Sequence, residues 1–194
     1  MSTGAIVLII VVVVLVIAGA LFAGQLMRRR RLRERFGPEY DRSIEEADNR
    51  RVAERVLTAR QKRHAGFELK PLSDSARVRY AQEWTLVQEH FVDQPDEAVA
   101  GAENLVDNVM RERGYPTDGF DQQAADLSVD HATAVDHYRT GHDIRTRHEQ
   151  AGVSTEDLRT ALVHYRKVFV ALVGVDAPQH TDDRVEDRVD EHRR

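Results

Sequence analysis

Cysteine is absent from this chain of 194 residues. Its absence excludes disulfide bonds, thiolate nucleophiles and zinc sites built on cysteine ligands. The sequence also lacks a glycine-rich phosphate loop, a serine in a nucleophile-elbow context and the HExxH pattern of metalloproteases. Because no stretch nominates a catalytic or cofactor-binding residue, we predict that the chain is not an enzyme and holds no cofactor.

Charge is absent from residues 4–27, twenty-four positions composed mostly of Val, Ile, Leu, Ala and Gly. An α-helix rises about 1.5 Å per residue, so this stretch would be about 36 Å long, against a hydrocarbon core of about 30 Å. In lipid, every backbone N–H and C=O must be satisfied inside the segment, which a single span achieves only as a helix. We predict a transmembrane helix over residues 4–27, preceded by a short extracytoplasmic segment, residues 1–3.

Positive charge follows the apolar stretch and does not precede it. The basic juxtamembrane segment, residues 28–35, holds six arginines and one glutamate, whereas residues 1–3 carry no charged side chain. Because short arginine-rich segments stay on the cytoplasmic side, this asymmetry predicts a bacterial inner-membrane protein with its amino terminus outside and the rest of the chain in the cytoplasm. The same side chains are our candidate contacts for anionic lipid. They are Arg28, Arg29, Arg30, Arg31, Arg33 and Arg35.

Small residues near the end of the apolar stretch support two further hypotheses. A cleavage site among residues 18–24 would release the rest as a secreted protein. We favour a retained anchor, because the charge follows the apolar run and the run is longer than a usual signal-peptide core. The pairs Gly19 with Ala23 and Ala20 with Gly24 have the spacing that lets membrane helices approach, so a homodimer through the span is a second hypothesis.

The remainder of the chain is acidic. The whole chain has 28 basic and 33 acidic residues, of which residues 28–35 take six and one, so residues 36–194 carry a formal net charge of −10. Such a body is repelled by nucleic acid, and we predict no nucleic-acid partner. Residues 176–194 hold seven acids and four arginines with few apolar side chains. We predict a disordered acidic tail there, because it cannot bury enough surface to order itself.

Glycine and proline residues divide the rest of the chain into segments. Within these segments apolar residues recur at helical spacing, which predicts an all-α fold. Residues 36–66 are charge-dense and are predicted to form one solvated stalk helix, held by pairs such as Glu46 with Arg50 and Arg51; a coiled-coil arm is the alternative. Residues 67–175 are predicted to form a cytoplasmic bundle of four to six helices. Trp84 is expected in its core, and Ser73 or Ser75, and Ser154 with Asp157, are expected to cap helices.

Four histidines between residues 130 and 150 raise the alternative of a metal-binding or enzymatic domain: His131, His137, His142 and His148. On one helix they cannot share an ion, because those on the same face are eleven residues apart, about 16 Å along the axis. A site would need ligands from another helix, for instance His164 or His90. We favour the simpler interpretation that Asp130 caps the helix and the histidines lie along a hydrated face, and we predict no metal ligand.

Four strings of the sequence carry a resemblance: RFGPEYDR at 35–42, RYAQEW at 79–84, VMRERGYP at 109–116 and DLSVDH at 126–131. With their order and the apolar amino terminus, they resemble a group of uncharacterised single-pass membrane proteins of high-GC, actinobacterial-type bacteria. The use of 25 arginines against three lysines is also typical of such genomes. The resemblance implies a membrane-anchored architecture and brings no activity, cofactor or partner with it.

These observations lead to a functional hypothesis. An anchor joined to an acidic helical domain without a catalytic constellation predicts a non-catalytic interaction or scaffolding module at the inner membrane. Its partners would be membrane lipid and a protein that the sequence does not identify.

Overall fold

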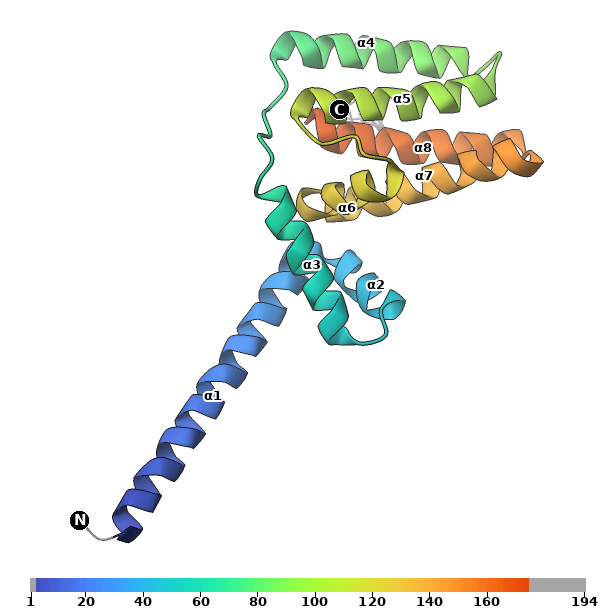
Figure 1. The fold of residues 1–194 in the computed structure, drawn as a ribbon. Helices are drawn as coiled ribbons and strands as arrows, with labels where there is room; N and C mark the ends of the chain where they lie inside the picture. Colours follow the sequence, from blue (N-terminus) through green and yellow to red (C-terminus); the bar gives the residue numbers. More distant parts are fainter. Residues whose placement is uncertain (1–2, 175–194) are drawn as a thin grey trace, which may run out of the picture.

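Eight α-helices make up the computed structural model, which describes residues 3–174 and has no strand among them (Figure 1). The prediction of an all-α fold is confirmed. The predicted acidic tail, residues 176–194, lies outside the described residues. The helices are α1 (Thr3–Phe36), α2 (Pro38–Glu46), α3 (Arg50–His64), α4 (Asp74–His90), α5 (Pro95–Arg113), α6 (Phe120–Asp130), α7 (Ala132–Ala151) and α8 (Thr155–Val173).

Helix α1 has 34 residues and continues without a break through the arginine cluster. Large side chains between Val11 and Met27 are exposed, whereas Leu32 and Phe36 are 3% and 0% exposed. A long row of exposed aliphatic side chains is costly in water and favourable in lipid. Within the described residues, α1 is the one helix that is long and apolar enough to cross a membrane by length and composition.

The prediction of one stalk helix over residues 36–66 is wrong, because the structure has two helices there. Gly37 has a φ of +48°, which favours glycine, and Pro38 occupies the first turn of α2, where its missing N–H costs nothing. After α2 the chain turns back. Asn49 begins α3 with its side-chain Oδ1 accepting a hydrogen bond from the Val52 N–H at 3.1 Å. Figure 1 shows α2 and α3 beside the end of α1.

The turn also removes the ion pairs predicted for the stalk. Ala47 is extended, so Glu46 and the arginines at 50 and 51 do not lie on one continuous helix. Glu46 instead accepts from Arg42 at 2.7 Å, one turn earlier in α2. The spacing of three and four residues supports a pair only where the helix is unbroken.

A small core joins the end of α1 to α2, α3 and α6. Its buried members are Leu32, Phe36, Tyr40, Leu57 and Val129. Burying a large apolar side chain contributes about 1.5–3 kcal/mol, so this cluster is enough to fix the two short helices against α1. Phe36, Tyr40 and Leu57 of residues 36–66 are buried in this core, so the segment is not the solvated stalk that its charge density suggested.

A larger core lies within α4–α8. Figure 1 shows α4, α5, α8 and α7 side by side, with α6 next to α7 and α3. Trp84 is 5% exposed and stacks on Phe169 with ring centroids 4.9 Å apart, as expected of a core anchor. The predicted caps are confirmed, because Ser73 accepts from the Ala76 N–H and Ser154 forms a capping box with Asp157.

Helices α7 and α8 pair through a triplet, His-Tyr-Arg, that occurs at 137–139 and again at 164–166. His137 Nδ1 lies 3.0 Å from His164 Nδ1, and the rings of Tyr138 and Tyr165 meet edge to face. The Tyr165 ring packs closely against Gly141, because a Cβ at position 141 would lie 3.1–3.3 Å from three ring atoms.

Changing Gly141 to Ala is expected to lower the free energy of unfolding by about 1–3 kcal/mol, because the Tyr165 ring is fully buried and cannot move aside. Alanine normally stabilises a helix interior by up to about 1 kcal/mol relative to glycine. Gly101→Ala is the matched control, since its new Cβ would meet only Val87 Cγ2 at 3.8 Å, and it is expected to stabilise. Urea unfolding of the full chain in detergent, followed by the fluorescence of Trp84, the one tryptophan, measures both. Equal effects at the two sites would contradict the packing argument.

Candidate functional site

The six arginines of the predicted lipid site divide into two groups in the structure. Three of them fasten α1 to neighbouring helices: Arg29 pairs with Glu54 of α3 at 3.2 Å, Arg33 with Asp41 of α2 at 3.3 Å, and Arg35 with Asp130 of α6 at 3.2 Å. Within the described chain, Arg28, Arg30 and Arg31 have no carboxylate partner. Arg28 instead donates to Thr58 Oγ1 at 3.0 Å.

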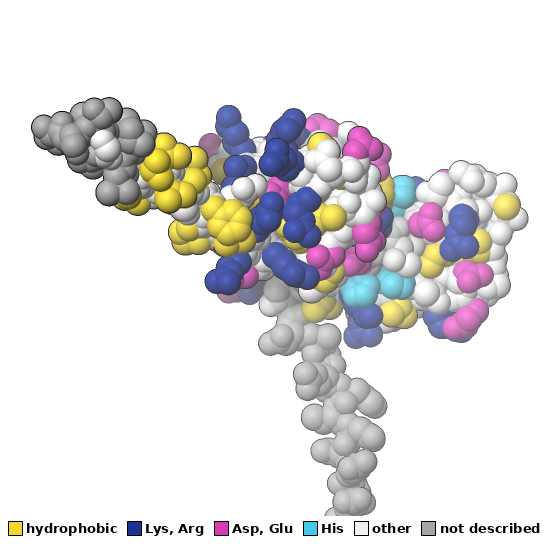
Figure 2. Space-filling model, turned by 90° about the horizontal axis from the view of Figure 1, so that it is seen from below, with side chains coloured by type: hydrophobic (Ala, Val, Ile, Leu, Met, Phe, Trp, Pro, Cys, Tyr) yellow, Lys and Arg dark blue, Asp and Glu magenta, His cyan; other side chains and the backbone are white. Residues whose placement is uncertain are grey.

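Helix α3 brings three further arginines to the same end of the molecule. Arg50, Arg51 and Arg55 are exposed, and none pairs with a carboxylate within residues 3–174. They reach this position because the turn at residues 47–49 reverses the chain and sets the start of α3 beside α1. Figure 2 shows the face from which α1 projects, where basic side chains gather next to apolar ones.

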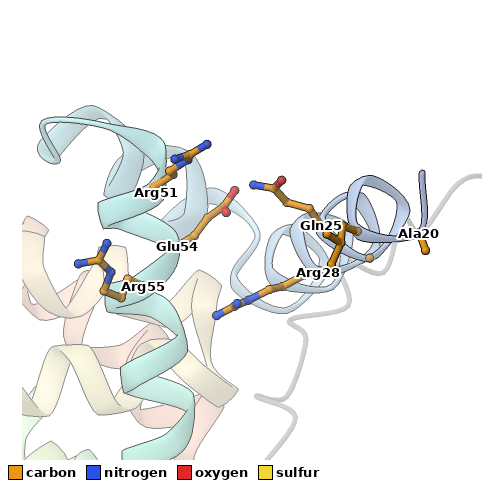
Figure 3. A pocket seen from close by; sticks show the side chains of 8 residues that line it. Ala20, Gln25, Arg28, Arg51, Glu54 and Arg55 are labelled. Atoms are coloured by element: carbon orange, nitrogen blue, oxygen red, sulfur yellow. The ribbon is translucent and has the colours of Figure 1, made fainter. Parts of the chain in front are cut away.

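A groove of about 560 Å³ lies between α1 and the first turns of α3. Figure 3 shows Gln25 and Arg28 reaching from α1 toward α3. The α1 wall of the groove is mostly apolar between Ala20 and Gly24, and the α3 wall carries charged side chains. Its lining residues are Ala20, Leu21, Gly24, Gln25, Arg28, Arg51, Glu54 and Arg55.

The carboxylate of Glu54 lines this groove, but its charge is already used inside the protein. It pairs with Arg29 and accepts a hydrogen bond from the Tyr40 hydroxyl at 3.0 Å, and its side chain is only 10% exposed. Burial together with this hydrogen bond raises the pKa of Tyr40, so the tyrosine stays a neutral donor. The charge left for a ligand of the groove is therefore positive.

A buried ion-pair cluster holds the α2–α3 segment in this position. Glu39 of α2 accepts from Arg60 of α3 at 2.6 Å and from Arg139 of α7 at 2.5 and 2.8 Å, with its side chain 2% exposed. Burial alone would raise the pKa of Glu39, but the hydrogen bonds and charges of Arg139 and Arg60 outweigh burial and lower it. We call these three residues the Glu39 clamp.

The aspartates near the start of α7 also pair with cations. Asp130 does not cap α7 as predicted, because His131 occupies the N-cap position and the Asp130 carboxylate contacts Arg35 and His64. Asp126 is fully buried and accepts from Arg63 Nε at 3.2 Å. The two aspartates thus serve as anchors for α1 and α3.

The histidines are not a hydrated row, which corrects the interpretation made from sequence. Each is partly buried and contacts a different group: His131 lies 3.3 Å from an Arg113 nitrogen, His142 bonds Glu103 at 2.7 Å and stacks on Phe120, and His148 accepts from the Val153 N–H. His137 meets His164, the ligand that a metal site would have needed from another helix. Over the described residues, no three His, Asp or Glu side chains converge as metal ligands.

The His137–His164 pair is expected to make the free energy of unfolding depend on pH. Burial, then the charge of Lys167, lowers the pKa of His137, and burial followed by His137 and Lys167 lowers that of His164. Below the ordinary value of 6.5 the unfolded chain binds protons that the folded pair resists, so stability falls as pH falls. We expect the urea midpoint to drop between about pH 7.5 and 5.5, and His164→Asn to reduce that drop.

His90→Asn is the control for this measurement, because His90 lies on the exposed end of α4 and contacts Glu97 instead of a second histidine. The drop in the midpoint should remain in this variant. A drop of the same size in His164→Asn and in the unaltered chain would show that the pair does not cause it.

Comparison with models of protein families, with curated proteins and with solved structures finds no match to this chain. What the chain does must therefore be argued from the geometry described above.

Proposed function

We propose that this chain is a single-pass protein of the bacterial inner membrane, with its amino terminus outside and a cytoplasmic helical domain that acts as a non-catalytic interaction or scaffolding module. The observation that carries the proposal is the division of α1. One unbroken helix has exposed apolar side chains as far as Met27 and then buries Leu32 and Phe36 against α2, α3 and α6. Membrane span and soluble helices are thus joined without a flexible linker.

Charge supports the orientation. The end of α1 that meets the helical domain carries the arginines, and α3 adds three more on the same side. Arginines directly after a span favour the cytoplasmic side, so the cluster at residues 28–35 supports a cytoplasmic position for the domain that follows it. The likeness to single-pass proteins of high-GC bacteria agrees with this arrangement.

Cysteine labelling tests the topology cleanly, because the chain has no cysteine of its own. We expect a membrane-impermeant maleimide to label Ser2→Cys in intact cells, and to label Val92→Cys, at a site 82% exposed, only after permeabilisation. Labelling of Val92→Cys in intact cells would overturn the orientation. Loss of residue 2 from the mature protein would instead support the secreted alternative.

We propose that the protein partner binds at the edge of the domain formed by α4 and α5. Leu86, 63% exposed, lines a shallow groove of about 490 Å³ whose walls include Glu89, Asp93 and Glu97. An apolar floor with acidic walls suits a basic amphipathic segment of another protein. We expect a photo-crosslinking residue at position 86 to give a discrete adduct in cells, and one at Val78, exposed on the same helix, to give none. Absence of an adduct at both positions would count against an interaction through this edge.

A further inference from the structure

The groove between α1 and α3 overlaps the membrane end of the predicted span. Its lining runs from Ala20 to Arg28, and the predicted span ends at Met27. Eight residues of helix correspond to about 12 Å, whereas the polar layer on one side of a bilayer is only about 5–8 Å thick. If α1 spans the membrane as proposed above, the first turns of α3 reach the headgroup layer and the groove opens into the hydrocarbon of the cytoplasmic leaflet.

The two walls of the groove differ in chemistry. The α1 wall consists toward the bilayer of Ala20, Leu21 and Gly24, and among the described residues no atom outside the helix backbone lies within 4 Å of the position where Gly24 would carry a Cβ. Arg28 lies at the domain end of this wall, and the facing wall, the first turns of α3, carries Arg51 and Arg55, while Glu54 is neutralised by Arg29. Guanidinium groups bind phosphate oxygens through paired N–H donors, and small residues leave room for a hydrocarbon chain.

We propose that this groove is a binding site for one anionic phospholipid, whose phosphate contacts Arg28, Arg51 and Arg55 and whose acyl chain lies along Ala20 and Gly24. The site differs from general attraction of the juxtamembrane arginines to a charged surface. It draws on residues nearly thirty positions apart in the chain, and it leaves out Arg29, Arg33 and Arg35, which pair with carboxylates. The proposal rests on the proposed function, because it needs α1 in the membrane.

A second, smaller opening of about 480 Å³ on the other flank of the α1–α3 contact shares Gly24 and Arg28 with the first. Arg28 therefore stands between the two openings, held by its hydrogen bond to Thr58. This hydrogen bond fixes the position of one guanidinium before any lipid arrives, which lowers the ordering cost of binding.

Native mass spectrometry of the full chain in detergent tests the site, with phosphatidylglycerol, phosphatidylcholine and inorganic phosphate as separate probes. We expect one phosphatidylglycerol to be retained and phosphatidylcholine not. Removing two arginine–phosphate contacts in Arg51→Gln/Arg55→Gln is expected to weaken retention roughly thirtyfold. The matched control is Arg30→Gln/Arg50→Gln, which removes the same charge from the same end of the molecule outside the groove lining and should retain the lipid. Equal weakening in both variants would mean general attraction and would overturn the proposal.

A second pair of variants leaves the charge of the protein unchanged and tests the apolar part of the groove. Gly24→Leu fills the apolar end of the groove and is expected to abolish retention, whereas Gly19→Leu lies outside the lining and is expected to have no effect. Trp84 fluorescence checks that each variant is folded. If inorganic phosphate displaced phosphatidylglycerol, the groove would be a site for a free anion, and the proposal of a lipid site would be overturned. If every variant, controls included, lost the lipid while cysteine labelling still reported the expected topology, the lipid site would be disproved. The proposed function would be unaffected.

Discussion

Replacing Glu39 by Gln is expected to lower the free energy of unfolding by about 3 kcal/mol, one of the largest effects in the molecule. The substitution keeps the shape of the side chain and removes the charge that two arginines share. Arg60 and Arg139 are only 19% and 18% exposed, so each would be left partly desolvated without its counter-charge. Breaking one partner of a buried ion pair costs far more than the net contribution of the intact pair.

Urea unfolding in detergent measures this loss, and hydrogen exchange of the α2 amides locates it. Glu45→Gln makes the same chemical change at an exposed position of the same helix and is expected to have little effect. Acid gives an independent check. The lowered pKa of Glu39 contributes stability above its ordinary value of 4.5 that is lost as pH falls, and Glu39→Gln should lack that component. Unchanged stability in Glu39→Gln would mean that the clamp does not hold the α2–α3 segment.

The Glu39 clamp matters for the proposed lipid site because it fixes the position of α3 along α1. If α2 and α3 detached from α7, Arg51 and Arg55 would no longer be held beside Ala20 and Gly24, and the lipid groove would open. Glu39→Gln is therefore expected to weaken phosphatidylglycerol retention although it touches no residue of the groove lining. Stability of the segment and binding at the membrane are properties of the same contacts.

Local features of the fold could be predicted from the sequence because neighbours in the chain decide them. The charge-free stretch predicts a helix over residues 4–27 that α1 includes, and Ser73 and Ser154 cap the helices that they precede. The turn before α3 also has a local signal in the sequence. Asn49 is a preferred N-cap residue, and it stands immediately before the helix that it caps.

The small core could not be predicted in the same way, because Phe36, Leu57 and Val129 come from three distant parts of the chain. The few apolar residues of the charged segment 36–66 suggested a solvated helix, whereas burial of Phe36 and Leu57 is complete. The same limitation applies to the arginines. The charge asymmetry of residues 28–35 treats all six alike, and only the packing of α2, α3 and α6 determines which of them pair with carboxylates.

Gly114→Ala is expected to be the most damaging small change in the large core, at about 3 kcal/mol. Gly114 ends α5 with a φ of +95°, where an L-residue costs about 1–2 kcal/mol. Its new Cβ would also lie 2.7 Å from the carbonyl oxygen of Glu68. That backbone cannot retreat easily, because the neighbouring Lys70 N–H donates to Arg113 O at 3.0 Å and ties the two segments together. The clash adds an overpacking cost of about 1–3 kcal/mol.

Gly174→Ala separates the cost of the left-handed backbone conformation from the cost of the clash with Glu68. Gly174 ends α8 in the same left-handed conformation, with a φ of +67°, and its Cβ would meet no atom of residues 3–174 within 4 Å. It should show the conformational cost alone, so the difference between the two alanine variants measures the contact with Glu68. Because α5 carries Leu105, Val106 and Val109 into the large core, loosening its end should also lower the midpoint of Trp84 fluorescence. Equal midpoints for the two variants would show that the segment before α4 yields, and that the end of α5 is not held by its backbone contact with residues 68–70.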